Sequence, residues 1–378
     1  MNEKEIGELR RRLRPDKCEP EALYGCLVNG KKEIVSGFRQ SLALTPTDDR
    51  EILFGLLRKT LTGGLGKNLL DIPFRNGQVL DSDEYRMFYA LRAAGEQSEE
   101  AIRAFFDRTA AALEIDGPYL ILLLQDRYGV RRYSKDGRDD GEGDEVFCYC
   151  IGAVCPVKET KPQLSFTPSD NVLRSLTSNG VVAPPELGFL FPSFDDRSAN
   201  VYDLLYYAKR SDELHPEFLA EVVRAEPPMP AGEQQAAFQD AIEQTLGENC
   251  SLEVAMALRD AVCEEIENAK ENEDGEPAEI GRDTVSRVLR DCGVEETRVE
   301  AFNEAYQARF GSASLPPANV VNTKQIEIST PDVQIRVRSD RSDLISARVI
   351  DGVRYLLIRA ESYVDLGGMQ IRLPNAEE

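Results

Sequence analysis

The stretch from Pro184 to Arg197, PPELGFLFPSFDDR, combines side chains that binding and catalytic sites often use. Adjacent carboxylates at Asp195 and Asp196 stand beside the cation of Arg197, and Glu186 adds another carboxylate. Three prolines within eleven residues exclude a helix, and loops are frequent functional sites. Two interpretations stay open. One is a ligand or active-site loop with exposed aromatic rings, and the other is a structural segment whose aspartates cap the next element and whose phenylalanines pack on a sheet.

A glycine-rich stretch, Thr62–Asn68 (TGGLGKN), has the composition of a phosphate-binding loop. A P-loop needs glycine five residues before its Gly-Lys pair and Ser or Thr after the lysine, where this chain has Leu61 and Asn68. Leu69 stands where a dinucleotide fingerprint needs its third glycine. A glycine-rich helix stop is the favoured interpretation. A backbone nest for an anion, backed by Lys67, is the alternative.

Metal-ligating residue types occur in spacings that do not suit a metal. Cys148, Cys150 and Cys155 form C-x-C-x4-C, whereas zinc sites pair cysteines as C-x2-4-C and need four ligands. The acidic segment 136–145 resembles a calcium loop, but its alignment puts Arg138 at a ligand position. We therefore expect buried strand cysteines, a solvated acidic loop and no cofactor.

The chain has a single histidine, His215, followed by Pro216, which predicts a position at a helix start. One histidine weakens the case for Ser-His or Cys-His catalysis and for metal sites with several histidines. The sequence thus favours a protein that is not an enzyme.

Arginines at two places are candidates for phosphate contacts. The densest basic run is Arg10, Arg11, Arg12 and Arg14, and Arg336 and Arg338 share one face of a strand with a period of two. If these surfaces meet, they form a positive patch whose affinity for nucleic acid falls steeply with salt. The favoured interpretation is that these arginines pair with carboxylates, because acidic residues outnumber basic ones by 67 to 45.

The elements that must position these residues follow from apolar periodicity and turn signals. Helices are expected at 3–13, from Thr47 to about Leu61, and after caps at Ser82 and Ser98. Strand pairs are expected at 23–28 with 32–38 around Asn29-Gly30, and at 119–125 with 129–133, with further strands at 68–73 and 146–157. The order does not alternate regularly, which predicts an α+β fold with an antiparallel sheet.

Three parts are expected along the chain. The first is a mixed domain over residues 1–223, and the Pro-rich run Arg224–Gly232 follows it as a linker. A helical block over 233–311 has about four helices and most of the net negative charge, with 21 Asp and Glu against 7 Lys and Arg in 226–310. A small β module over 318–373 has a hairpin turn at Asp351-Gly352.

The amino-acid composition and net charge restrict the classes of partner that the protein is expected to bind. The 378 residues have a formal net charge of −22, which disfavours nucleic acid and anionic membranes as direct partners and favours a protein partner. No apolar run reaches the ~18–20 residues that span a bilayer. The first residues, MNEKEIGELRRRLRPDK, have no apolar stretch of a secretory signal, so a cytoplasmic location with reduced cysteines is expected.

Five stretches, EIGELRRRLRPDK, LGKNLLDIPF, AVCPVKETKP, VVAPPELGFLFPSFDDRSANVYDLLYY and RVIDGVRYLLIRAE, resemble an uncharacterised family of proteins from Gram-positive bacteria over essentially the whole chain. That resemblance implies no activity, cofactor or catalytic residue. The layout alone is also similar to bacterial nucleoid-associated proteins of comparable length. The sequence favours a non-enzymatic binding or scaffolding protein, with a nucleoid role as one form of it. The alternative is an enzyme or small-ligand binder that uses the Pro184–Arg197 loop.

Overall fold

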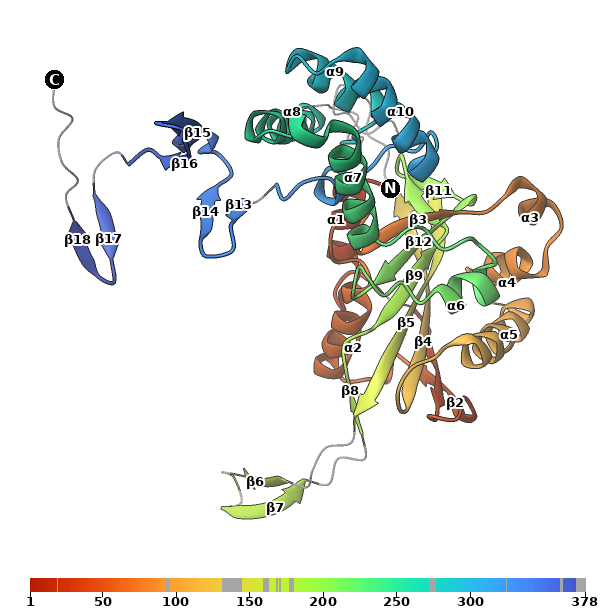
Figure 1. Cartoon of the computed structure of the whole chain (residues 1–378). Helices are drawn as coiled ribbons and strands as arrows, with labels where there is room; N and C mark the ends of the chain where they lie inside the picture. The colour runs from red at the N-terminus through yellow and green to blue at the C-terminus, as the bar shows by residue number, and fades with distance from the viewer. Residues whose placement is uncertain are drawn as a thin grey trace, which may run out of the picture. The chain divides into compact units, whose positions relative to one another are not determined.

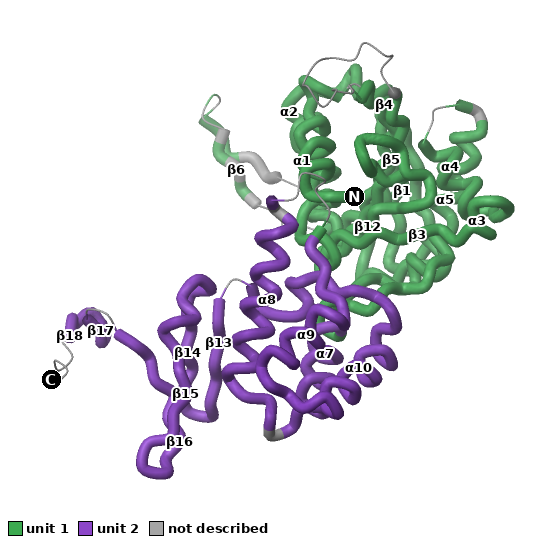
Figure 2. Tube along the Cα trace, turned by 90° about the horizontal axis from the view of Figure 1, so that it is seen from above, with its two compact units in different colours: residues 1–233, 275–277 green, residues 234–274, 278–378 purple. Residues whose placement is uncertain are grey.

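The computed structural model describes residues 1–18, 20–92, 95–130, 145–158, 163–167, 169, 171–176, 180–271, 277–323, 325–360 and 363–371. The segment that resembles a calcium loop lies outside them, apart from Glu145. The chain divides into two compact units (Figure 2). Unit 1 comprises residues 1–233 with 275–277, and unit 2 comprises residues 234–274 with 278–378.

Unit 1 is built on an eight-stranded sheet in which every pairing is antiparallel (Figure 1). The strand order is β2-β1-β4-β5-β9-β12-β3, and β8 pairs with β5. This confirms the α+β class and the antiparallel sheet. The strands are β1 (Ala22–Val28), β2 (Ile34–Ser41), β3 (Leu69–Pro73), β4 (Tyr119–Val130), β5 (Glu145–Lys158), β8 (Val181–Val182), β9 (Leu187–Phe191) and β12 (Asp203–Ala208).

Helices cover both faces of this sheet, so unit 1 has three layers (Figure 1). Successive side chains of a strand point to opposite faces, and β4 shows the result. Ile121 and Leu123 are buried in one core, and Leu122 and Leu124 are buried in the other. One face bears α1 (Glu3–Arg12) and α2 (Thr47–Lys59), and the other bears α3 (Asn76–Asp81), α4 (Asp83–Leu91), α5 (Glu96–Ala112), α6 (Pro216–Phe218) and the π-helical turn η1 (Leu219–Val223).

Two turn predictions in unit 1 are wrong. Asn29-Gly30 does not form a two-residue turn, because the Asn29 side chain accepts hydrogen bonds from the backbone N–H groups of Lys31 and Glu33. The left-handed residue of that loop is Lys32, at φ 64°. The hairpin expected at 119–133 is also wrong, because β4 runs without a break to Val130 along β5.

Aromatic rings cover two glycines of the sheet. Gly25 pairs directly with Phe38 on β2, and Gly152 pairs directly with Phe189 on β9. A Cβ atom at Gly25 would lie 2.1 Å from the Phe38 ring, and one at Gly152 would lie 2.2 Å from the Phe189 ring. Each ring therefore occupies the space that a side chain on the opposite strand would need.

Unit 2 contains the acidic helices α7 (Ala231–Leu246), α8 (Leu252–Glu271), α9 (Arg282–Asp291) and α10 (Glu296–Phe310), in agreement with the predicted helical block. They bury a core of their own around Phe238, Leu289, Phe302 and Tyr306. None of the described helices in either unit combines the length and the apolar content needed to cross a bilayer.

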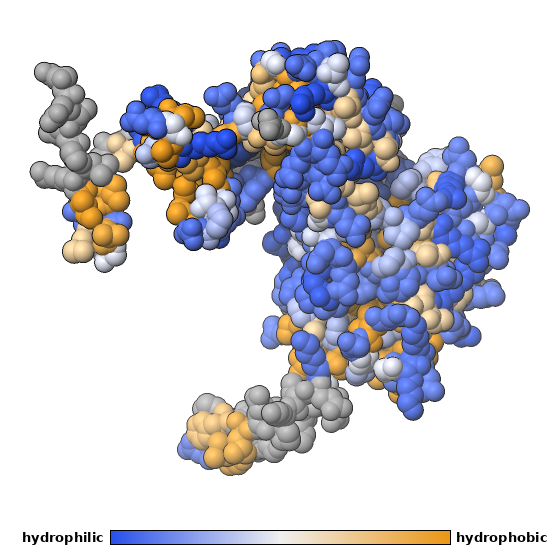
Figure 3. All heavy atoms as spheres, viewed as in Figure 1, coloured by the Kyte–Doolittle hydropathy of each residue, from blue (hydrophilic) through white to orange (hydrophobic). Residues whose placement is uncertain are grey.

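The described C-terminal strands of unit 2 form separate two-stranded hairpins. Asp351 and Gly352 have φ 51° and 79°, which confirms the predicted hairpin turn. Val349 and Met369 keep more than 60% of their surface exposed, and apolar spheres are visible at the last hairpin in Figure 3. The hairpins are β13 (Gln325–Ser329) with β14 (Gln334–Arg338), β15 (Ile345–Ile350) with β16 (Val353–Ile358), and β17 (Val364–Leu366) with β18 (Met369–Ile371); unit 1 has a similar one, β6 (Gln163–Thr167) with β7 (Val172–Leu176).

Candidate functional site

The Pro184–Arg197 segment is part of the sheet and not an irregular loop with exposed rings. It forms β9 and the short strand β10 (Ser193–Asp195), and β9 lies between β5 and β12. Phe189, Phe191 and Phe194 are all at most 2% exposed. Of the two interpretations, the one with exposed aromatic rings is wrong, and the phenylalanines are buried in the sheet: a central strand is covered on both faces, so every position of LGFLF is buried.

The charged residues of this segment lie at opposite ends of it. Glu186 precedes β9 and forms an ion pair with Lys209 at 2.7 Å. Asp196 and Arg197 form the turn from β10 to β11 (Ser198–Asn200), both with positive φ. The Arg197 guanidinium pairs with Glu8 of α1 at 2.6 Å. The structure therefore does not bring Glu186 together with the Asp195–Arg197 group.

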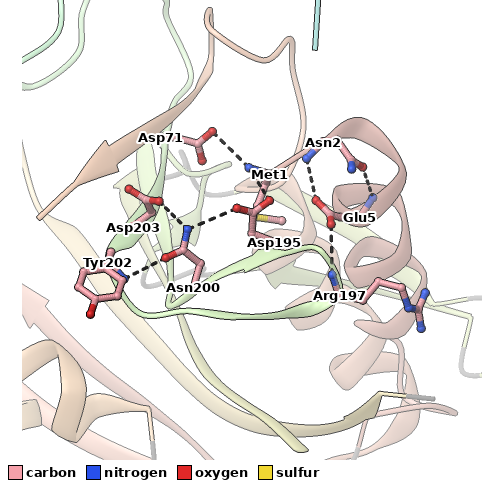
Figure 4. A network of polar contacts seen from close by, with 9 residues as sticks. All are labelled: Met1, Asn2, Glu5, Asp71, Asp195, Arg197, Asn200, Tyr202 and Asp203. Carbon is pink, nitrogen blue, oxygen red and sulfur yellow. Dashed lines mark hydrogen bonds and ion pairs between the residues drawn. The ribbon is translucent and has the colours of Figure 1, made fainter. Parts of the chain in front are cut away.

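Asp195 instead belongs to a network of carboxylates around the α-amino group of Met1 (Figure 4). The amino nitrogen lies 3.4 Å from an Asp71 carboxylate oxygen and 3.8 Å from one of Asp195. Asn200 donates to Asp203 at 2.6 Å and to Asp195 at 3.4 Å. The network links the start of α1 to β3, β10, β11 and β12.

Glu5 joins this network from the first turn of α1. Its carboxylate accepts the backbone N–H groups of Asn2 and Arg197, and the Asn2 side chain accepts the N–H of Glu5, which completes a capping box. Burial raises the pKa values of Glu5, Asp71 and Asp203 above the ordinary carboxyl range. Among the described residues, no group of three or more His, Cys, Asp or Glu is arranged to hold a metal ion.

Two of the three strand cysteines and the histidine are also held by structural contacts, while Cys148 is only half-buried. Cys150 and Cys155 of β5 are fully buried on opposite faces of the sheet, and burial raises their thiol pKa values. Such thiols stay protonated and are poor nucleophiles. His215 starts α6 as expected, with Nδ1 3.2 Å from the Glu217 carboxylate.

The strongest candidate for a binding site is a groove between α1 and α2, which we call the α1–α2 groove. Its volume is about 690 Å³. The two helices lie side by side in both ribbon views (Figures 1 and 2). Positions 7, 10 and 11 share one face of α1 because they are three or four residues apart, Arg14 lies just beyond the end of that helix, and 51, 55, 58 and 59 share one face of α2. The groove is lined by Gly7, Arg10, Arg11, Arg14, Asp16, Glu51, Gly55, Arg58, Lys59 and Thr62.

Most cations of the α1–α2 groove have no carboxylate partner. Arg58 pairs with Glu51 at 2.6 Å and donates to the Leu13 carbonyl. Within the described parts of the chain, no carboxylate oxygen lies within 4.0 Å of the charged nitrogens of Arg10, Arg11, Arg14 or Lys59. The arginines at the end of α1 complement the negative end of the helix dipole, but this leaves their charge open to a ligand.

Arg12 points to the other side of α1, because one residue further along a helix is a rotation of 100°. Its guanidinium donates to the carbonyls of Lys17 and Arg127 and pairs with Asp126 at 3.3 Å. Asp126 is 7% exposed and also accepts hydrogen bonds from the Tyr149 hydroxyl and the Cys18 thiol.

This Arg12–Asp126 cluster forms part of a second groove of about 440 Å³. It lies where β1 begins and β4 continues past it, since the β1–β4 register has the pair Leu23 and Leu124 at this end and β4 runs on to Val130. We call it the sheet-edge groove. It is lined by Arg12, Asp16, Lys17, Pro20, Glu21, Ala22, Tyr24, Arg92, Gln125, Asp126 and Arg127.

The remaining candidates lie elsewhere. Lys67 is exposed in the glycine-rich turn between α2 and β3, where Gly63 and Gly66 have positive φ. Arg336 and Arg338 are exposed on β14 of unit 2 and pair with Glu327 and Asp340.

Sequence analysis missed the α2 side of the α1–α2 groove. Arg58 and Lys59 follow each other at the end of a helix, where they also complement the helix dipole, so nothing marks them as ligand contacts. The available signal is the spacing of Gly7, Arg10 and Arg11, which predicts one small and cationic helix face, with Arg14 just after the helix.

The fold and these two grooves define an α+β protein with a three-layer antiparallel unit and cationic surface grooves. The chain belongs to the family described as Domain of unknown function (DUF4317), whose model matches residues 1–369. This confirms the resemblance to an uncharacterised family over essentially the whole chain. No curated protein matches the sequence.

Proposed function

We propose that the chain is a non-enzymatic binding protein that holds a phosphate-bearing ligand in the α1–α2 groove. The observation that supports this most directly is the set of four cations around one groove for which the described part of the chain offers no carboxylate partner: Arg10, Arg11, Arg14 and Lys59. They stand out in a protein with a net charge of −22, where carboxylates are abundant.

The chemistry of the groove favours phosphate. Guanidinium groups donate in pairs to phosphate oxygens, and such charge-assisted hydrogen bonds are about twice as strong as neutral ones. Among the described residues that line the groove, none has an aromatic or large apolar side chain. The groove is therefore suited to a charged ligand and not to an apolar one. A volume of about 690 Å³ lies within the range of ligand sites and has room for several phosphate groups.

Glycine keeps the groove open on both of its walls. A Cβ at Gly7 would lie 3.4 Å from an Arg11 guanidinium nitrogen, and one at Gly55 would lie 3.8 Å from an Arg58 guanidinium nitrogen. Any larger side chain at these positions would extend into the space that the proposed ligand occupies.

Titration calorimetry with inorganic tripolyphosphate tests the proposal. We expect binding that weakens as salt rises, and a loss of about tenfold or more in the variant Arg10→Ala/Arg11→Ala, because each charge-assisted hydrogen bond contributes about 1.5–3 kcal/mol. The matched control is Arg348→Ala/Arg354→Ala, which removes two exposed arginines of unit 2 and changes the net charge equally.

Equal loss in both variants, or no binding at low salt, would refute the α1–α2 site. Phosphorus NMR of the recovered ligand tests the non-enzymatic part. Tripolyphosphate that is recovered intact supports it, and conversion to shorter phosphates contradicts it.

A further inference from the structure

The α1–α2 groove and the sheet-edge groove adjoin at the end of α1. Arg10, Arg11 and Arg14 line the first and Arg12 lines the second, while Asp16 lines both. The turn that separates them is held by hydrogen bonds from the backbone N–H groups of Lys17 and Cys18 to the Arg14 carbonyl. A ligand that leaves one groove across this turn enters the other.

The sheet-edge groove also contains cations that are not part of its ion pairs. Arg12 is paired with Asp126, and Glu21 lies 3.8 Å from Arg39. Lys17, Arg92 and Arg127 have no carboxylate oxygen within 4.0 Å among the residues that the structure describes. Among the described residues, the two grooves together hold seven cations without a carboxylate partner: Arg10, Arg11, Arg14, Lys17, Lys59, Arg92 and Arg127. Of these, Arg92 lies over the Tyr89 ring at 3.7 Å, and Asp16 is the one carboxylate of the described lining without a cation partner.

The two grooves differ in what they offer besides charge. The sheet-edge groove contains the half-buried ring of Tyr24 and the side-chain amide of Gln125. Among its described lining residues, the α1–α2 groove has neither an aromatic ring nor a side-chain amide. Arg39 lies over the Tyr24 ring at 5.8 Å and donates to its hydroxyl, which holds the ring in place. Gln125 is fixed by two hydrogen bonds from its amide nitrogen, to the Leu91 carbonyl and the Ser98 hydroxyl. A fixed ring beside unpaired cations is the combination that binds a base and its phosphates.

We propose that the two grooves form one track for a short single-stranded nucleic acid, with phosphates along Arg10, Arg11, Arg14 and Lys59 and a base against Tyr24. This rests on the proposed function and names its ligand class. A duplex is disfavoured because stacking hides the base faces that Tyr24 would contact. A long strand gains nothing further, because phosphates beyond the track meet a protein whose acidic residues outnumber its basic ones by 67 to 45 over the whole chain.

Fluorescence anisotropy with labelled oligothymidylates of increasing length, at low and moderate salt, tests the track. We expect the affinity to rise with length and then to level off once the track is filled, and tripolyphosphate to compete. Tyr24→Leu should weaken oligothymidylate binding about five- to one-hundredfold, the range that stacking on one aromatic ring supplies. Tripolyphosphate affinity should not change in that variant, and Tyr24→Phe, which keeps the ring and loses only the hydroxyl contact with Arg39, should bind oligothymidylate more tightly than Tyr24→Leu does.

Arg127→Ala is the second variant, since Arg127 is exposed and its backbone carbonyl still accepts from Arg12. It should weaken oligothymidylate binding and leave tripolyphosphate binding unchanged, which decides the matter if Tyr24→Leu does not fold. Equal oligothymidylate affinity in wild type, Tyr24→Leu and Arg127→Ala overturns the track while leaving the α1–α2 site intact. Binding of poly-glutamate as tight as that of the oligothymidylate also overturns it, in favour of an acidic protein partner. Loss of tripolyphosphate binding in Arg10→Ala/Arg11→Ala separates this result from a failure of the proposed function.

Discussion

The substitution Asp126→Asn should destabilise unit 1 strongly, although it changes only one atom of the side chain. Asp126 is buried, accepts hydrogen bonds from Tyr149 at 2.8 Å and Cys18 at 3.2 Å, and forms an ion pair with Arg12 at 3.3 Å. All three contacts are made to the same carboxylate oxygen. Asparagine can offer its amide oxygen there but is neutral, so the Arg12 guanidinium loses its counter-charge.

The size of the loss in unfolding free energy depends on the contacts that Arg12 keeps. Breaking a buried ion pair by removing one charge costs about 3–5 kcal/mol. Arg12 keeps hydrogen bonds to the carbonyls of Lys17 and Arg127, and 20% of its side chain is exposed. We therefore expect the low end of that range, about 3 kcal/mol, in the free energy of unfolding.

Urea unfolding, followed by circular dichroism, measures this loss. Tyr149→Phe is the matched control, because it removes one donor to Asp126 and keeps the ring; it should cost about 1 kcal/mol. In Arg12→Met/Asp126→Asn the two changes should be far from additive, since each alone removes the same pair. A loss below about 1 kcal/mol for Asp126→Asn, or a smaller one than for Tyr149→Phe, would refute the reasoning.

Three further predictions concern other parts of the chain. Burial raises the pKa values of Glu5, Asp71 and Asp203, so the native state binds these protons at higher pH than the unfolded chain does, and their contribution to stability should grow as pH falls. Glu5→Gln should accordingly flatten the dependence of the unfolding free energy on pH between about 4 and 7, and an unchanged slope would contradict the role of Glu5. Gly55→Ala should raise the unfolding free energy by about 0.5–1 kcal/mol through helix propensity while it weakens tripolyphosphate binding, as calorimetry with wild type in parallel can show. Limited proteolysis should cut first within 225–230, whose residues are exposed or half-buried, and resistance there would mean that this linker is packed.

Local signals predicted the elements whose chemistry is local. The helix from Glu3 and the cap at Ser82 were predictable because the capping hydrogen bonds join residues three apart. The two-residue turn predicted at Asn29-Gly30 was wrong because the Asn29 side chain accepts backbone hydrogen bonds that stabilise a longer loop. The sequence left open whether the aromatic rings of PPELGFLFPSF are exposed or buried. That depends on whether the strand is central or at an edge of the sheet, which is decided by partners distant in sequence.

The residues of the candidate site likewise fall into those that local sequence could identify and those that depend on tertiary packing. Arg10 and Arg11 were identifiable from one helix and its charge. Arg58 and Lys59 are more than forty residues away and become relevant only when α2 packs beside α1. The opposite direction of Arg12 follows from helix geometry, but its contact with Asp126, which comes from a distant strand, does not.

The ring-covered glycines of the sheet have a consequence for how this family varies. Since the Phe189 ring fills the space over Gly152, and Phe38 does the same over Gly25, neither partner can change freely while the other stays. A β-carbon at Gly152 would displace the ring from the core, and a smaller side chain at 189 would leave a hollow over the glycine. Family members should therefore inherit each glycine with its ring, and where one is replaced the other should be exchanged in the same lineage. Two pairs of alignment columns, 25 with 38 and 152 with 189, would record this linked inheritance.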